Sequence, residues 1–329
     1  MSRGKPRRIN FNKTLGVNYM LDPKTNYQGK NFLGAIGNTP LVKLDFDVKP
    51  TILAKMEHLN PGGSIKDRSA LFMLQEAERT GKLQPGGTIV EASSGNQGIA
   101  LAMIGAIKGY KVIITAPDRT SSEKIATLQA YGAKVFVCPD TDNLHDPNGY
   151  HAKAKTLHEQ IENSYMPNQY YNIENPKAHY LTTGPEIWEQ SQGQLTHCFM
   201  SMGSCGTISG VGRYLKEKNK NIKIIGIDAM TSKLSMPDAP KAYKTEGMGV
   251  DVITDTLDRS VIDEIVPVSD DVTFSMTRNL AKKGYLVGLS SGAVMHVALE
   301  HAKKLNASDT IVVIFADSGR AYLSKVFNS

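Results

Sequence analysis

Short runs rich in Val and Ile alternate along the whole chain with longer segments of helical periodicity. Runs such as TIVEA, KVIITAP and TIVVIFAD are apolar at nearly every position, which is typical of strands in a parallel sheet covered on both faces. Helical segments stand between them; SSEKIATLQAYG, for example, has a serine at its start and a glycine at its end. The alternation predicts an α/β architecture, in which ligands bind where strand ends meet helix starts.

The chain length favours two packed domains, because 329 residues exceed what one hydrophobic core usually holds. A composition of 40% hydrophobic and 21% charged residues is ordinary for a soluble enzyme. The longest apolar runs, such as 311–316, are too short to cross a bilayer, and no apolar signal core opens the chain. We therefore expect a cytoplasmic protein that does not bind membranes.

The net charge of +6 comes largely from residues 1–13, which contain five basic residues and no acidic one. Such a segment can contact nucleic acid, but a solvated, flexible arm is the simpler interpretation, and no nucleic-acid partner is expected. Cysteine usage fits a reducing compartment, because Cys138, Cys198 and Cys205 form no CxxC pair. The eight histidines include no HExxH motif and no Cys/His cluster, so no metal site is expected.

One strand-to-helix turn, NPGGSIKDR, places Lys66 in the first turn of a predicted helix. The positive end of the helix dipole disfavours an ammonium group there, which lowers its pKa and suits a nucleophile and proton carrier. The alternative is a surface lysine beside Asp67 and Arg68. Spacing alone leaves both interpretations open.

Two further turns are predicted anion sites. EASSGNQG combines hydroxyl and amide side chains with a helix start, which suits a carboxylate or a phosphate; an ordinary helix cap is the alternative. SMGSCGTISG suits a small phosphate. It is not a Walker A loop, since no Lys-Ser/Thr follows the glycine, and Cys205 replaces the second glycine of a dinucleotide motif. One lysine and two anion sites are what a phosphorylated aldehyde cofactor and an amino-acid substrate would together require.

Five motifs, NPGGSIKDR, SSGNQG, SMGSCGT, EGMG and GLSSGA, occur in one order between about Gly34 and Phe327. In that order they resemble the β-family (fold type II) of pyridoxal-phosphate enzymes, and within it the cystathionine β-synthase and cysteine synthase group. The resemblance implies two open, twisted, mostly parallel sheets flanked by helices, pyridoxal 5′-phosphate as cofactor, and a homodimer. It also implies a smaller, mobile substrate-loop domain at 50–158 and a larger cofactor-phosphate domain made of 14–49 and 159–329.

The resemblance implies roles for particular residues. Lys66 resembles the lysine that holds the cofactor as a Schiff base and moves the α-proton of the substrate. Asn96 matches the residue that hydrogen-bonds the cofactor 3′-oxygen, and Ser290 matches the serine that faces the pyridine nitrogen. The phosphate loop corresponds to Gly203, Ser204, Cys205, Gly206 and Thr207. The substrate-binding residues correspond to Ser93, Ser94, Gln97, Gln169 and Gly247.

The implied activity is a β-replacement on serine or O-acetylserine through an aminoacrylate. Segments NQYYN, NPKAHY, TLDRSVID and DSGRAYL resemble cystathionine β-synthases and favour homocysteine as the thiol, which gives cystathionine in transsulfuration. Cysteine synthase, which uses O-acetylserine and sulfide for cysteine biosynthesis, is the alternative; a serine or threonine dehydratase and a non-catalytic binding protein are further ones. The lack of a regulatory C-terminal module and of a Cys-Pro haem-binding pattern predicts a catalytic core alone.

Three positions depart from the family pattern. Cys205 stands where glycine is usual in the phosphate loop, so this turn has to accommodate a side chain. Gln97 stands where threonine is common, and Val250 stands where cystathionine synthases often carry tyrosine. The last two bear on the choice of substrate and not on the cofactor. We interpret Cys205 as a buried, inert thiol, with a redox switch as the alternative.

Overall fold

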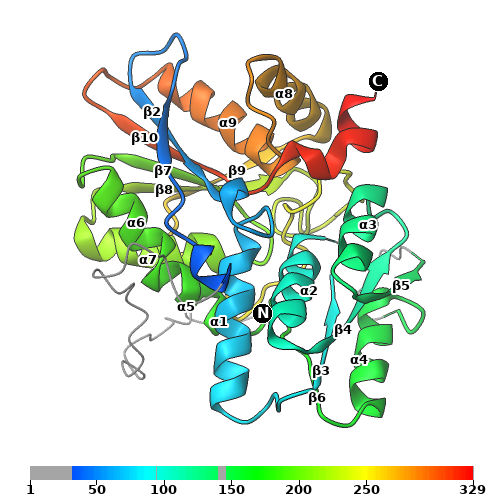
Figure 1. The fold of residues 1–329 in the computed structure, drawn as a ribbon. Helices are drawn as coiled ribbons and strands as arrows, with labels where there is room; N and C mark the ends of the chain where they lie inside the picture. The colour runs from blue at the N-terminus through cyan, green and yellow to red at the C-terminus, as the bar shows by residue number, and fades with distance from the viewer. Residues whose placement is uncertain (1–31, 94, 140–145, 329) are drawn as a thin grey trace.

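The computed structural model describes residues 32–93, 95–139 and 146–328, whose strands form two sheets (Figure 1). The strands are β1 (Leu41–Leu44), β2 (Thr51–Met56), β3 (Thr88–Ala92), β4 (Lys111–Pro117), β5 (Lys134–Cys138), β6 (Ser164–Tyr165), β7 (His197–Ser201), β8 (Lys223–Ala229), β9 (Glu264–Val268) and β10 (Thr310–Phe315). The larger sheet has the order β1-β2-β10-β7-β8-β9 and the smaller one β5-β4-β3-β6. Every pairing is parallel except that of β1 with β2. The predicted fold class is confirmed.

Helices cover both faces of each sheet. They are α1 (Lys66–Arg79), α2 (Asn96–Lys108), α3 (Ser122–Ala130), α4 (Tyr150–Gln160), α5 (Glu174–Leu181), α6 (Thr183–Gln190), α7 (Gly206–Lys218), α8 (Asp270–Lys282) and α9 (Leu289–Ala302). On the larger sheet, α8 and α9 lie on one face and α7 on the other; on the smaller sheet, α2 and α4 lie on opposite faces (Figure 1). The strands are buried from both sides, which explains their continuous Val and Ile content.

Two elements differ from the sequence prediction. The sequence predicts one helix from Pro176 to Gln190, whereas the structure has two, because Thr182 leaves helical geometry between α5 and α6. Pro185 lies in the first turn of α6, where its missing N–H group costs nothing, but inside one continuous helix it would break a hydrogen bond. Strand β9 was not predicted, because Pro267 interrupts its apolar pattern; the strand forms at the edge of the larger sheet, where proline is tolerated.

Sheet membership bears on the expected domain boundary. Strand β2 lies inside the expected smaller domain at 50–158 but pairs with β10 in the larger sheet, and β6 lies beyond 158 but pairs with β3. We therefore propose that the smaller domain runs from about β3 to β6. The basic segment 1–13 lies outside the described residues. Among the helices that are described, none is long and apolar enough to span a membrane.

Candidate active site

Lys66 is the first residue of α1, and its amine reaches the predicted phosphate loop. Its Nζ donates a hydrogen bond to Ser204 Oγ at 2.9 Å. Burial lowers the pKa of Lys66 from 10.5 to about 8, whereas Cys205 and Glu91 act in the opposite direction. The lowered pKa agrees with the sequence prediction, although desolvation is its largest cause. A lysine with this pKa is neutral in a useful fraction near neutral pH and can act as a nucleophile and base.

A buried cluster of charges fixes the helix that carries Lys66. Arg68, which is 1% exposed, donates to Glu57 Oε2 at 2.7 Å and to Glu186 Oε1 at 2.6 Å. Lys55 from β2 donates to the other oxygen of Glu186 at 2.6 Å. Removing one partner from such a buried network typically costs about 3–5 kcal/mol, because it leaves an uncompensated charge. The network therefore holds α1 rigidly against β2 and α6.

The predicted phosphate loop connects β7 to the first turn of α7. Cys205 has φ +60°, a left-handed conformation that glycine adopts more easily, which agrees with the glycine usual at this position. A Cβ atom on Gly206 would lie 2.0 Å from Asn175 Oδ1, and one on Gly203 would lie 2.9 Å from the carbonyl oxygen of Gly247. The loop is thus packed closely on α5 and on the EGMG segment, and its helix start suits an anion.

Cys205 itself lacks the surroundings of a reactive thiol. It is 3% exposed, and burial raises its pKa to about 12, with Asp228 adding to the effect and Lys66 opposing it. The thiol is therefore protonated at neutral pH, whereas redox-active cysteines need an accessible thiolate. The structure favours the inert interpretation.

Helix α5, whose sequence contains NPKAHY, presents Asn175 and His179 to the phosphate loop. Asn175 Nδ2 donates to Ser204 Oγ at 3.1 Å and to the carbonyl oxygen of Gln169 at 2.8 Å. His179 Nε2 lies 3.3 Å from Thr207 Oγ1, and burial lowers the pKa of His179 well below 6.5, with Arg68 and Lys66 adding to the effect. A neutral imidazole and a fixed amide thus brace the loop without adding charge.

The EASSGNQG turn follows β3 and opens α2. Ser93 Oγ accepts hydrogen bonds from the N–H groups of Gly95 and Gly98 at 3.2 and 3.0 Å, so this side chain shapes the turn. Gln97 accepts a hydrogen bond from Ser69 Oγ at 3.2 Å through its Oε1, which directs its amide nitrogen away from Ser69. That nitrogen is buried and has no partner among the described residues. Ser94 lies outside the described residues.

Gln169 is brought to the same region by Glu91. Glu91 on β3 accepts the N–H groups of Asn168 at 2.8 Å and of Gln169 at 3.3 Å. Burial raises the pKa of Glu91 to about 7, and these two donors and Lys66 oppose the shift. The side-chain oxygen of Gln169 is buried without a partner in the described part of the chain. Gln97 therefore offers an unpaired donor and Gln169 an unpaired acceptor near the site, as a polar ligand requires.

Asn96 and Ser290 lie at helix starts beside the end of β10. Asn96, the first residue of α2, donates through Nδ2 to Asp317 Oδ2 at 2.6 Å. Asp317 pairs with Ser64 in a β-bridge, so it also adjoins the turn that carries Lys66. Ser290 is buried at the second position of α9, and the preceding Gly288 donates its N–H to the Asp317 carbonyl oxygen at 3.0 Å. The C-terminal end of β10 thus gathers three of the predicted cofactor-binding segments.

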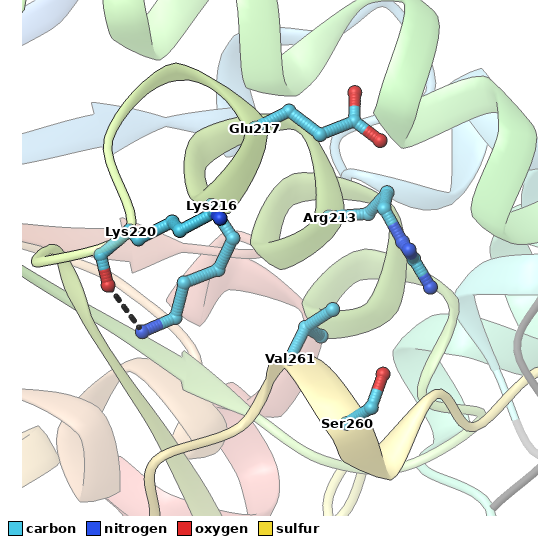
Figure 2. Close-up of a pocket in the computed structure, with 6 residues that line it drawn as sticks. All are labelled: Arg213, Lys216, Glu217, Lys220, Ser260 and Val261. Carbon is cyan, nitrogen blue, oxygen red and sulfur yellow. Dashed lines mark hydrogen bonds between the residues drawn. The ribbon is translucent and has the colours of Figure 1, made fainter.

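A surface hollow of about 330 Å³ lies at the other end of α7 (Figure 2). It is lined by Arg213, Lys216, Glu217, Lys220, Ser260 and Val261. Arg213 pairs with Asp258, whose N–H donates to Ser209 Oγ at 2.8 Å. Nearby, Thr256 Oγ1 donates to the Ser204 carbonyl oxygen at 2.6 Å. None of the predicted site residues lines this hollow. The segment 256–261, which forms part of its wall, contacts the phosphate loop and α7 through Thr256 and Asp258.

The arrangement fits a small phosphorylated carbonyl compound. The loop at Gly203–Thr207 can hold the phosphate, Lys66 can bind the carbonyl carbon covalently through Nζ, and the unpaired amide nitrogen of Gln97 can donate to a carboxylate. Among the described residues, no group of three or more His, Cys, Asp or Glu side chains could hold a metal ion. Fold and site together define an enzyme that works with a covalently held phosphorylated cofactor.

Comparison with known proteins identifies the family. Residues 32–317 match the family model described as pyridoxal-phosphate dependent enzyme. A cystathionine beta-synthase of Apis mellifera is 44% identical over 305 residues, which are 90% of this chain and 60% of that protein. A cysteine synthase of Staphylococcus aureus (strain N315) is 41% identical over 299 residues, which are 89% of this chain and 95% of that protein.

Solved structures agree with these relatives. The structure of an O-acetylserine dependent cystathionine beta-synthase from Helicobacter pylori matches with a TM-score of 0.84 and 39% identity, over 91% of this chain and 98% of that one. The chain therefore belongs to the pyridoxal-phosphate-dependent enzyme family, in its fold type II branch, and pyridoxal phosphate is its cofactor. It spans 60% of the length of the Apis mellifera relative and 54% of that of a cystathionine beta-synthase from Mus musculus.

Several residues of the site were not assigned a role from the sequence: Glu91, Asn175, His179, Thr256, Asp317 and Tyr322. Most of them lie in or beside segments that resemble cystathionine β-synthases, namely NPKAHY, TLDRSVID and DSGRAYL. That resemblance could have marked the segments as important. The contacts made by each side chain could not be found without the structure.

Proposed function

We propose that the protein catalyses a β-replacement on serine or O-acetylserine with homocysteine, which yields cystathionine. The observation that carries the proposal is the position of Lys66, whose desolvated amine is bonded to the phosphate loop next to the unpaired amides of Gln97 and Gln169. An amino acid bound there through its carboxylate would have its Cα near a base with a pKa of about 8.

In this proposal each residue has a defined task. Lys66 holds the cofactor, takes the α-proton of the substrate on Nζ and later returns it. Gln97 and Gln169, together with Ser93, Ser94 and Gly247, bind or frame the substrate carboxylate. The phosphate loop at Gly203–Thr207 would hold the phosphate, Asn96 would bind the ring oxygen, and Ser290 would bind the ring nitrogen. Pyridoxal phosphate, when bound, supplies the electron sink for the electrons of the broken Cα–H bond.

Homocysteine is favoured by the relatives and by the segments around the site. The Apis mellifera and Helicobacter pylori proteins carry the name cystathionine beta-synthase, and the latter is described as O-acetylserine dependent. Asn175, Asp258 and Asp317, which support the site, lie in the segments that resemble such enzymes. The second candidate is cysteine synthase, which is supported by the match along 95% of the Staphylococcus aureus protein.

Product analysis tests the proposal. Serine and O-acetylserine are each supplied with homocysteine or with sulfide, and cystathionine and cysteine are quantified by mass spectrometry. Cystathionine as the faster product supports the proposal, and faster formation of cysteine supports the second candidate. Lys66→Ala should abolish both products, and Lys82→Ala, at an exposed lysine after α1, should change neither. Formation of either product at an unchanged rate by Lys66→Ala would contradict the role of Lys66.

We further propose, on the family resemblance, that the enzyme is a cytoplasmic homodimer whose smaller domain moves toward the substrate. Sedimentation velocity of the holoenzyme would test the dimer, and a single species with the monomer mass of 35.9 kDa would contradict it.

A further inference from the structure

Asp317 is a buried carboxylate at the end of β10 that the proposed mechanism does not use. It is 2% exposed, and its Oδ2 accepts two hydrogen bonds, from Asn96 Nδ2 at 2.6 Å and from Tyr322 Oη at 2.5 Å. Its other oxygen is buried and has no partner within the described residues. Because both donors use Oδ2, this oxygen is an acceptor whether the carboxyl group is ionised or not.

Tyr322 connects this carboxylate to the smaller domain and to the C-terminal segment. Lys124 of α3 donates to Tyr322 Oη at 3.2 Å and to Glu246 at 2.5 Å, and Lys325 donates to the other oxygen of Glu246 at 2.6 Å. In Figure 1 the C-terminal segment lies between α8 and α3, which agrees with these contacts. Tyr322, which is itself bonded to Lys124 of the smaller domain, therefore fixes the orientation of Asp317.

The acceptor character of Asp317 determines how Asn96 can be oriented. An amide side chain has a donor end and an acceptor end, and rotation by half a turn exchanges them. An oxygen that only accepts admits only the orientation with Nδ2 toward Asp317. The second N–H of Asn96 then remains available for another acceptor.

We propose that Asp317 is a positioning residue that, through Asn96, keeps an N–H donor available to the ring oxygen of the cofactor. The inference rests on the proposed function, which assigns Asn96 to that oxygen. A donor stabilises the negatively charged form of the ring oxygen, in which the proton resides on the imine nitrogen of the lysine link. That form absorbs in the visible range, and the form with a neutral ring oxygen absorbs in the near ultraviolet. Asp317 thus favours the visible form.

The ratio of the two absorbance bands in the holoenzyme tests the proposal. In Asp317→Asn the new amide can donate to Asn96 Oδ1 and invert Asn96, so the ring oxygen loses its donor. Because hydrogen bonds to charged groups are strong, we expect the ratio of visible to near-ultraviolet absorbance to fall roughly tenfold. Tyr322→Phe leaves Asp317 Oδ2 an acceptor for Asn96 and should change the ratio less than about twofold. Asp309→Asn, which changes a carboxylate before β10, is the matched control and should leave the ratio unchanged.

A double variant separates action through Asn96 from direct action on the cofactor. If Asp317 acts through Asn96, adding Asp317→Asn to Asn96→Ala should change the ratio less than about twofold. A full tenfold effect in the Asn96→Ala background would overturn the proposal, as would an unchanged ratio in Asp317→Asn that retains its cofactor. Should Asp317→Asn fail to fold, Asp317→Ala decides, because it leaves Asn96 free to rotate, and an unchanged ratio there counts against the proposal.

Borohydride reduction followed by peptide mass spectrometry separates this inference from the proposed function. Cofactor fixed on Lys66 in the wild type and in Asp317→Asn shows that the lysine link forms in both proteins. Absence of fixed cofactor on Lys66 in the wild type would contradict the proposed function itself. Fixed cofactor with an unchanged band ratio would overturn only the role of Asp317.

Discussion

Replacing Glu91 with glutamine should remove a large pH dependence from the stability of the apoprotein. Glu91 is 2% exposed, and burial raises its pKa from 4.5 to about 7. A carboxyl group with a raised folded-state pKa stabilises the fold fully below its unfolded-state pKa, and this contribution is lost as pH rises through the folded-state pKa. With these two values, about 2.5 kcal/mol of stability is lost between about pH 5 and about pH 8.

Urea unfolding across this pH range measures the effect. Since glutamine does not titrate, the free energy of unfolding of Glu91→Gln, relative to the wild type, should increase by about 2.5 kcal/mol from the acid to the alkaline end. Glu159→Gln, at an exposed position of α4, serves as the control and should show almost no trend. A difference between Glu91→Gln and the wild type that stays constant within about 0.5 kcal/mol would refute the reasoning.

The same substitution should also affect substrate binding. Glu91 accepts two backbone N–H groups in the Asn168–Gln169 turn, and glutamine can accept only one of them without placing its own NH₂ group against the other. The turn that carries Gln169 would shift, so the KM for the amino-acid donor should rise roughly tenfold at about pH 8. Below about pH 7 wild-type Glu91 is itself protonated, and the two KM values should converge.

Three further predictions concern the cofactor side of the site. The Lys66 amine of the apoprotein should react with pyridoxal with a pH midpoint near 8, because burial lowers its pKa from 10.5. Borohydride trapping at a series of pH values measures this midpoint, and a midpoint near 10.5 would contradict the prediction. Asn175→Ala should destabilise the fold by about 2 kcal/mol and weaken cofactor binding, because two hydrogen bonds are lost; calorimetry with Asn279→Ala as surface control tests this. Cys205, whose pKa is about 12, should resist alkylation in the native holoenzyme, and mild peroxide should not release cofactor; rapid native labelling would contradict its inertness.

Most of the fold could be predicted from the sequence because the parallel strands are uniformly apolar. Ile311–Ile314 of β10 and Ile89–Val90 of β3 are buried on both sides, so their composition alone marks them as interior strands. Elements at a sheet edge or between two helices were harder to predict, because their residues do not follow the pattern of a regular strand or helix. Pro267 belongs to a strand but cannot donate to a ladder, and Thr182 lies between two helices that follow each other directly in the sequence.

In the candidate site, too, features formed by neighbouring residues could be predicted, and contacts between distant residues could not. The positions of Lys66 and of the loop Gly203–Thr207 at helix starts could be predicted because turn and helix start are contiguous in the sequence. Asp317 could not, because its partner Asn96 is 221 residues away. The pairing of Glu91 with Asn168 spans 77 residues, and a buried Glu in a strand has no local pattern that reveals its partner. The helix starts that carry the candidate site could therefore be predicted from the sequence, whereas the distant residues that contact them could not.

The NPKAHY segment, whose resemblance favours homocysteine, lies on the cofactor side of the site, so its contacts should not themselves select between the two thiols. In NPKAHY, His179 contacts Thr207 of the phosphate loop. Residues that act on the cofactor influence a step common to both thiols. We therefore expect His179→Gln to lower turnover with homocysteine and with sulfide by the same factor, measured with one donor at saturation. A change of more than about threefold in the ratio of the homocysteine rate to the sulfide rate, which corresponds to less than about 1 kcal/mol, would contradict this expectation. It would mean that the segment itself selects the thiol.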